Sequence, residues 1–180
     1  MTPVLLTDAL LLRPFEHEDA RAFAAVMNHP SVAYGVCAEP LPFTELHASA
    51  RILMIRAAEM QGKDLAWAIE SQEGDLIGMI ALRSAPDGTS DMGFAIAPQW
   101  QGQGHASAAL GAVLEWLKIN RPGLRLQVEV FTDQPAGLSV LHRAGFIEAG
   151  ERTRFSIARE RSDNAMRFVH PVFGGRPMSA

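Results

Sequence analysis

The chain of 180 residues has one cysteine and no excess of basic side chains. A single cysteine, Cys37, excludes an intramolecular disulfide framework and favours a reducing compartment. The formal net charge of −4 gives no basic face of the kind that nucleic-acid binding requires. No apolar stretch approaches a membrane span, and no basic segment at the N-terminus begins a signal peptide. We therefore expect a cytoplasmic protein that binds neither nucleic acid nor membrane.

Glycine and proline, at 15 and 11 residues, are not enriched, and no low-complexity segment or internal repeat divides the chain. The length fits one domain with a substantial core. We predict a single domain over residues 1–173 and a loose C-terminal tail over residues 174–180. Histidines and acidic residues do not cluster at metal-ligand spacing around Cys37, so no metal is expected.

Hydrophobic periodicity and turn residues predict an alternation of strands and helices that is typical of an α+β, mixed three-layer domain. Thr44 is expected to cap the second helix, and its core-facing residues are expected to be Leu46, Ile52, Leu53 and Ile55. The expected strands cover residues 10–14, 65–70, 76–82, 92–96, 124–131, 155–158 and 166–170. The expected helices cover residues 16–27, 44–60 and 106–117, with a further helix that starts near residue 135 and ends before Gly145.

Residues 99–106, which read QWQGQGHA, lie between an expected strand and an expected helix. This arrangement brings unpaired backbone N–H groups and the positive end of a helix dipole to one point, where anions bind. Glycines there let a ligand approach the backbone closely. A dinucleotide fingerprint is excluded because its third small position falls on Ser107, and a P-loop because His105 replaces its lysine. A phosphate loop and an ordinary strand-to-helix turn both remain open at this point.

The spacing Q-x-x-G-x-G over residues 99–104 resembles the acyl-CoA pyrophosphate loop of the GNAT N-acetyltransferase superfamily. Similar blocks occur at residues 10–15 (LLLRPF), 76–80 (LIGMI), 92–96 (MGFAI) and 141–146 (LHRAGF). Together they resemble the branch of ribosomal-protein N-terminal acetyltransferases over nearly the whole chain. The resemblance implies a GNAT-like acyl-CoA N-acyltransferase fold. Its central, mostly antiparallel sheet would have splayed fourth and fifth strands and flanking helices.

The resemblance also implies acetyl-CoA as the cosubstrate and assigns its contacts. Backbone groups of Ala95, Ile96 and Ala97 would bond the pantetheine arm. Backbone N–H groups of the glycine loop would hold the pyrophosphate. These belong to Gln101, Gly102, Gln103, Gly104, His105 and Ala106.

One departure from the family pattern concerns the helix after the fifth strand. Relatives often carry Asn-x-x-Ser there, whereas this chain has Gln134 and Gly137, which keep an amide and lose a hydroxyl. Both are still expected to lie beside the cofactor. The only tyrosine, Tyr34, is far away in sequence, and Ser139 would project from another side of the helix. The acid that protonates the leaving thiolate is therefore unassigned.

The reaction implied by the resemblance is direct attack of a neutral amine on the thioester. An α-amino group, with a pKa of about 8, reaches the neutral form more readily than a lysine amine near 10.4. Asp91, at the start of the fourth strand, and Glu129, on the fifth, are the candidate bases. Strand carboxylates that are merely solvated or salt-bridged are the alternative for both residues.

The acceptor is expected to be a peptide N-terminus or a small-molecule amine, selected by residues 31–43 and by the last hairpin, near residues 154–167. The hairpin arginines could favour an acidic acceptor or be simply solvated; they are Arg152, Arg154, Arg159 and Arg161. Residues 166–169 could form an edge strand that pairs two copies into a homodimer. A catalytically weak CoA-binding sensor and a structural domain with an incidental glycine loop remain the alternative functions.

Overall fold

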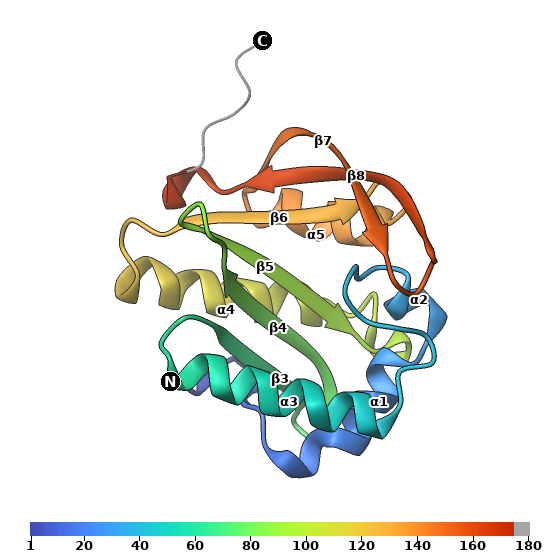
Figure 1. Cartoon of the computed structure of the whole chain (residues 1–180). Helices are drawn as coiled ribbons and strands as arrows, with labels where there is room; N and C mark the ends of the chain where they lie inside the picture. The colour runs from blue at the N-terminus through green and yellow to red at the C-terminus, as the bar shows by residue number, and fades with distance from the viewer. Residues whose placement is uncertain (175–180) are drawn as a thin grey trace.

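A mixed sheet of eight strands runs through residues 1–174, the part of the chain that the computed structural model describes (Figure 1). Its spatial order is β1-β2-β3-β4-β5-β6-β8-β7. The strands are β1 (Leu5–Leu6), β2 (Leu10–Pro14), β3 (Leu65–Ser71), β4 (Leu76–Ser84), β5 (Thr89–Ile96), β6 (Arg125–Phe131), β7 (Ile147–Ser156) and β8 (Arg161–Val169). The helices are α1 (Ala20–Met27), α2 (Pro30–Ala33), α3 (Glu45–Met60), α4 (His105–Asn120) and α5 (Pro135–Arg143), with short 3₁₀ turns η1 (His17–Asp19), η2 (Pro98–Trp100) and η3 (Pro171–Phe173).

Helices cover both faces of this sheet, with α1 and α3 on one side and α4 and α5 on the other (Figure 1). Because side chains alternate along each strand, the sheet contributes residues to two separate hydrophobic cores, one on each face. The α4 core contains Ile80, Leu110 and Val128, and the α1–α3 core contains Phe23 and Ile52. The predicted three-layer α+β architecture is confirmed.

The pair formed by β5 and β6 is parallel, whereas every other neighbouring pair in the described sheet is antiparallel. A parallel pair needs a crossover, and α4 supplies it on one face. Pairing joins only Thr89 to Arg125, Ser90 to Leu126 and Asp91 to Gln127, after which the two strands diverge (Figure 1). These are the fourth and fifth strands of the family pattern, so the predicted splay is confirmed.

Local signals in the sequence set the helix ends. The hydroxyl of Thr44 accepts a hydrogen bond from the backbone N–H of His47 at 3.4 Å, which makes it the N-cap that the sequence predicts for α3. After α5, Gly145 takes a left-handed conformation with φ +85°, and the N–H of Phe146 bonds the carbonyl of Leu141. Helix α1 ends at Met27, and Pro30, at the first position of the next helix, begins the short α2.

The final hairpin differs from the sequence prediction. The strands predicted over residues 155–158 and 166–170 overlap only parts of β7 and β8, and Ile157 and Ala158 lie in the turn. Polar side chains dominate β7, so its apolar residues do not mark its length. Strand β8 pairs with both β6 and β7, so residues 166–169 are not an edge strand. The edge on this side of the sheet is β7.

Helix α3 corrects a second expectation. Ala48, Ile52 and Ile55 are its buried residues, whereas Leu46 and Leu53 are 77% and 60% exposed. The two sets lie on opposite sides of the helix, and the sequence alone does not say which apolar stripe meets the sheet. Of the predicted tail, residues 175–180 lie outside the described residues. No helix within residues 1–174 is long and apolar enough to cross a membrane.

Close packing of β4 against β5 gives a stability prediction. A Cβ added at Gly78 would lie 2.3 Å from the carbonyl oxygen of Ala95, a backbone atom that cannot turn aside. We expect Gly78→Ala to lower the free energy of unfolding by about 1–3 kcal/mol, measured by urea denaturation. Gly93→Ala is the matched control, since a Cβ at Gly93 meets nothing within 4 Å. Equal effects of the two substitutions would contradict this account.

Candidate active site

The edge of β5 that faces β6 is the first element of the site. Two backbone hydrogen bonds show which residues of β5 bond to β4. The N–H of Ala97 donates to the carbonyl of Ile77 at 2.8 Å, and the carbonyl of Thr89 accepts from the N–H of Ala85 at 2.8 Å. Odd-numbered residues of β5 therefore bond β4, and even-numbered residues turn their N–H and C=O groups towards β6. Beyond Asp91 no strand in the described sheet pairs with these groups. Phe94 and Ile96 thus present backbone groups along an open strand edge.

This alternation corrects part of the predicted pantetheine contact. Ala95 directs its backbone groups to β4, and Ala97 donates to Ile77 and accepts from the N–H of Trp100 at 2.9 Å. Of the three predicted residues, only Ile96 faces the open edge. Its carbonyl accepts a hydrogen bond from Gln101 Nε2 at 2.8 Å, which ties the glycine loop to the strand. Phe94 also faces the open edge. It was not predicted, because a sequence motif does not reveal which residues of a strand direct their backbone groups to which side.

The glycine loop follows directly, between η2 and α4. Gly102 and Gly104 have φ of +75° and +88°, a left-handed backbone that few side chains tolerate. The N–H of Gln101 donates to the carbonyl of Pro98 at 3.2 Å, so this N–H, which was predicted to bind the pyrophosphate, already has a partner. Six successive N–H groups have no hydrogen-bond partner among the described residues. They belong to Gly102, Gln103, Gly104, His105, Ala106 and Ser107.

These six donors fit a pyrophosphate. They lie at the N-terminus of a helix of 16 residues, where the helix dipole also favours negative charge. A Cβ built on Gly102 or Gly104 meets nothing within 4 Å, so the loop is open to a ligand. His105 packs against Trp100, with ring centroids 5.6 Å apart, and its buried Nε2 has no partner among residues 1–174.

The start of α5 lies on the other side of the diverging strands. Gln134 is the N-cap residue, and its Oε1 would be 3.7 Å from a Cβ built on Gly35, so its side chain lies beside the loop after α2. A Cβ at Gly137 would lie 3.1 Å from Val130 Cγ1. The absence of a side chain at Gly137 therefore allows close contact between α5 and β6.

The two candidate bases share the sheet face that α1 and α3 cover. Asp91 accepts a hydrogen bond from Gln127 Nε2 at 2.6 Å, at the last paired position of β5 and β6. Glu129 lies two residues further along β6, and its side chain is 15% exposed. It accepts a hydrogen bond from Arg154 on β7. The structure therefore places both carboxylates at the divergence of the strands.

Arg154 is the cation that pairs directly with Glu129. Burial disfavours its charged form, but Glu129 and the nearby Cys37 and Asp91 outweigh burial and raise its pKa. The guanidinium stays charged at any physiological pH. Arg83 lies directly opposite Asp91 on β4, and Arg167 lies directly opposite Glu129 on β8, so both carboxylates have arginines as neighbours on this sheet face.

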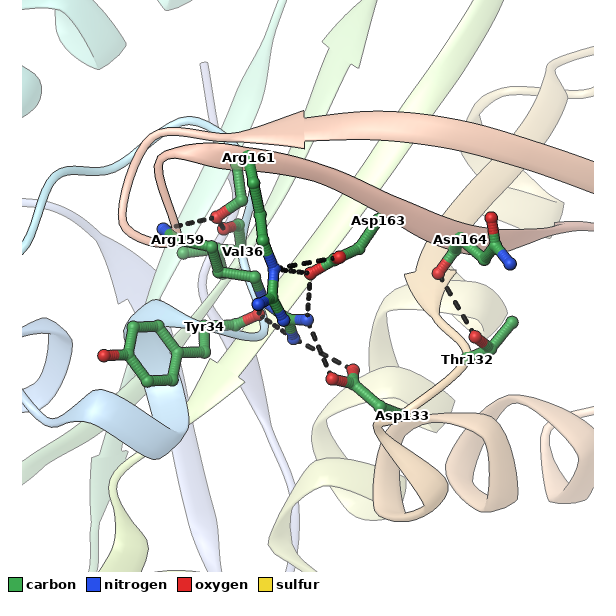
Figure 2. A network of polar contacts seen from close by, with 9 residues as sticks. Tyr34, Val36, Thr132, Asp133, Arg159, Arg161, Asp163 and Asn164 are labelled. Atoms are coloured by element: carbon green, nitrogen blue, oxygen red, sulfur yellow. Dashed lines mark hydrogen bonds and ion pairs between the residues drawn. The ribbon is translucent and has the colours of Figure 1, made fainter.

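Residues 34–37 contact the hairpin turn, and we call them the acceptor loop because they lie within residues 31–43, the segment expected to select the acceptor. The N–H of Ile157 donates to the carbonyl of Cys37 at 3.1 Å. Figure 2 shows the second contact, in which Arg159 Nε donates to the carbonyl of Tyr34 at 2.8 Å. Tyr34, distant in sequence, is thus brought to the hairpin. Three of the four hairpin arginines pair with acidic residues, Arg154 with Glu129, and Arg159 and Arg161 with Asp163. The fourth, Arg152, donates to the carbonyl of Glu151 at 2.8 Å.

A cavity of about 350 Å³ lies between α4, the end of α5 and η3. Ser107 belongs both to its lining and to the row of free N–H groups, so the cavity adjoins the glycine loop. Its lining consists of Ser107, Gly111, Leu114, Glu115, Lys118, Arg143, Ala144, His170, Val172 and Phe173. No group of three or more potential metal ligands occurs within residues 1–174.

His170, in this lining, makes stability depend on pH. Burial lowers its pKa below 6.5, and its hydrogen bond to Ala144 (3.1 Å) opposes this only in part. As pH falls below 6.5, the unfolded chain therefore binds a proton before the folded one, so stability falls. We expect His170→Gln to lose less stability than wild type between about pH 7.5 and 5, measured by urea unfolding. Parallel pH profiles would contradict this.

These features define a class of protein. An open edge on a parallel pair of diverging strands, followed by a glycine loop with free N–H groups, is the arrangement of an acyl-CoA-binding transferase. Residues 9–147 match the family model described as an acetyltransferase (GNAT) domain. The chain belongs to the GNAT acetyltransferase family and is an N-acetyltransferase.

Similar proteins agree with this family. The chain is 29% identical to an uncharacterized N-acetyltransferase, YoaA, of Bacillus subtilis (strain 168), over 83% of this chain and 86% of that protein. It is 24% identical to the L-amino acid N-acetyltransferase AaaT of Escherichia coli (strain K12), over 82% and 89%. The solved structure of RimL, a ribosomal L7/L12 alpha-N-protein acetyltransferase in complex with coenzyme A, has a TM-score of 0.82 at 15% identity and covers 96% of this chain and all (100%) of that one.

Proposed function

We propose that residues 1–173 form one acetyltransferase domain that transfers the acetyl group of acetyl-CoA to the α-amino group of a peptide or small molecule. The observation that carries the proposal is the row of six free N–H groups, Gly102 to Ser107, beside the open edge of β5. Such a row binds a pyrophosphate through the backbone, so binding depends on the shape of the loop and hardly on its side chains.

The rest of the cofactor would lie along neighbouring groups. The outward N–H and C=O groups of Phe94 and the N–H of Ile96 would bond the pantetheine amides as an added strand does. The cavity would take the distal, phosphate-bearing end, since Lys118 and Arg143 line it and outnumber its one carboxylate, Glu115. Acetyl-CoA supplies the acetyl thioester, and the protein holds it at the divergence of β5 and β6.

On the acceptor side, Glu129 is proposed to accept the proton of the attacking amine. It lies on the face away from α4, and Arg154 fixes its carboxylate. Asp91, on the neighbouring strand, is the second carboxylate at the divergence of β5 and β6. Because an α-amine has a pKa of about 8, a sizeable neutral fraction exists at physiological pH without further help.

Two similar proteins support an α-amine as acceptor. One is named for L-amino acids and the other for the alpha-N position of a ribosomal protein. Their common feature is the α-amino group, which is free in an amino acid and terminal in a protein. The proposal for this chain therefore covers α-amines and leaves side-chain amines aside.

Release of the CoA thiol from acetyl-CoA, followed by mass spectrometry of the acceptor, tests the proposal. The acceptors are free amino acids, a short peptide with a free N-terminus, and an Nα-blocked peptide with one lysine. Turnover of the first or second supports an α-amine acceptor, whereas turnover of the lysine peptide alone overturns it. Acetyl-CoA binding without turnover of any of these amines would favour a CoA-binding sensor, which Gly137 and the lost hydroxyl make the second candidate.

A further inference from the structure

Arg159 is the most connected charged residue in the hydrogen-bond network of residues 1–174. It lies in the turn between β7 and β8, where a long charged side chain is usually solvated, yet its side chain is only 6% exposed. Its guanidinium packs over the ring of Phe131, with Cζ 4.2 Å from the ring centroid. Burial at a hairpin turn indicates that the neighbouring groups hold Arg159 for a structural or functional reason.

The guanidinium fork contacts three parts of the chain at once (Figure 2). It makes a two-bond contact with Asp133, Nη1 to Oδ2 at 2.8 Å and Nη2 to Oδ1 at 2.9 Å. Nη1 also donates to Asp163 on β8 at 2.8 Å. Nε and Nη2 donate to the carbonyl of Tyr34 at 2.8 and 2.6 Å. Only arginine offers planar donors in this arrangement; a lysine ammonium cannot satisfy all three acceptors with the same geometry.

The partners of Arg159 come from the two sides of the proposed reaction centre. Tyr34 begins the acceptor loop, which also carries Cys37. Asp133 immediately precedes Gln134, the N-cap of the helix at the cofactor side. Arg159 therefore fixes the acceptor loop relative to the start of α5, and Asp163 fixes both to the sheet.

We propose that Arg159 is a positioning residue that holds the acceptor loop against α5 and so shapes the acceptor subsite of the proposed acetyltransferase. It does not touch the reacting atoms; it acts through Tyr34 and Asp133. Loss of its fork would release the loop, weaken acceptor binding and leave acetyl-CoA binding at the glycine loop intact. This inference rests on the proposed function for the acceptor, but the placement of the loop can be tested separately.

Cys37, the only cysteine, reports on the loop without any substrate. We expect Arg159→Lys to increase the rate at which dithiobis(nitrobenzoate) labels Cys37 by about tenfold or more. A change of this size corresponds to the loss of one charge-assisted hydrogen bond that holds the loop in place. Arg161→Lys is the matched control, because Arg161 bonds the same Asp163 at 3.0 Å and is 67% exposed, whereas the side-chain hydrogen bonds to the Tyr34 carbonyl come from Arg159. It should change the labelling rate less than about twofold.

A second experiment measures the KM for the α-amine that the wild-type enzyme acetylates. Arg159→Lys should raise its KM by about tenfold, with the acetyl-CoA-dependent shift of the melting temperature unchanged. If Arg159→Lys does not fold, Asp133→Asn removes the two-bond contact and keeps the guanidinium, and the same changes are expected. Equal labelling and KM in the Arg159 and Arg161 variants would overturn the inference. A wild-type protein without turnover would instead overturn the proposed function, and the labelling result would still decide the placement of the loop.

Discussion

Replacing Gly104 by aspartate is expected to abolish the stabilisation that acetyl-CoA gives to the wild-type protein. The aspartate side chain would place a negative charge at the N-terminus of α4, among the six N–H groups proposed to bind the pyrophosphate. At 100 times its dissociation constant, a ligand adds about 2.7 kcal/mol to the free energy of unfolding. For a domain of this size that is a shift of about 5–10 °C in the melting temperature. The variant should show no shift at the same concentration of acetyl-CoA.

Gly123→Asp is the matched control for the strain that this substitution introduces. Gly104 and Gly123 have φ of +88° and +89°, and a Cβ at either position meets nothing within 4 Å. Both variants therefore suffer the same backbone penalty, and aspartate is among the residues that best tolerate it. Only the Gly104 variant should lose the response to acetyl-CoA. If both variants keep it, acetyl-CoA does not bind at this loop; if wild type shows none, the proposed function fails.

The sequence predicts local backbone conformation well, because turns and helix caps depend on short-range chemistry. The glycine loop needs two left-handed residues before a helix, and only glycine takes that conformation freely, so Gly102 and Gly104 are visible in the sequence. The same holds for the cap at Thr44 and for Gly145 after α5. The splay of β5 and β6 was implied by the family resemblance alone and not by any pattern in the residues themselves.

Relations between distant segments were not predictable. Tyr34 and Arg159 are 125 positions apart, and neither belongs to a motif. The four hairpin arginines look alike in sequence, yet Arg159 is nearly buried and Arg161 is 67% exposed. Likewise, the phase of the β4–β5 ladder decides that Phe94 and Ile96, and not Ala95 and Ala97, present backbone groups at the open edge. A shift of one residue in strand pairing leaves the composition of the strand unchanged, but it exchanges the residues whose backbone groups are free with those whose backbone groups are bonded.

Replacing Glu129 by glutamine is expected to reduce kcat for the α-amine about 100-fold or more, the usual effect of removing a general base. Glutamine has nearly the same shape, and its amide oxygen can still accept the hydrogen bond from Arg154, so the packing around β6 should be kept. The amide cannot accept a proton from the attacking amine. Acetyl-CoA should stabilise the variant as it does wild type, because the glycine loop is unchanged.

Asp91→Asn separates a specific role of Glu129 from the loss of one negative charge. Asp91 lies on the same sheet face, on the neighbouring strand, and is held by Gln127 at 2.6 Å. If negative charge only attracts the ammonium form of the acceptor, both variants should raise KM to a similar extent and leave kcat nearly unchanged. If Glu129 accepts the proton, its variant alone should lose kcat, and the loss should lessen at high pH, where hydroxide and the neutral amine replace the missing base. A larger loss of kcat in the Asp91 variant would assign the base to Asp91, and Glu129 would then serve to hold Arg154.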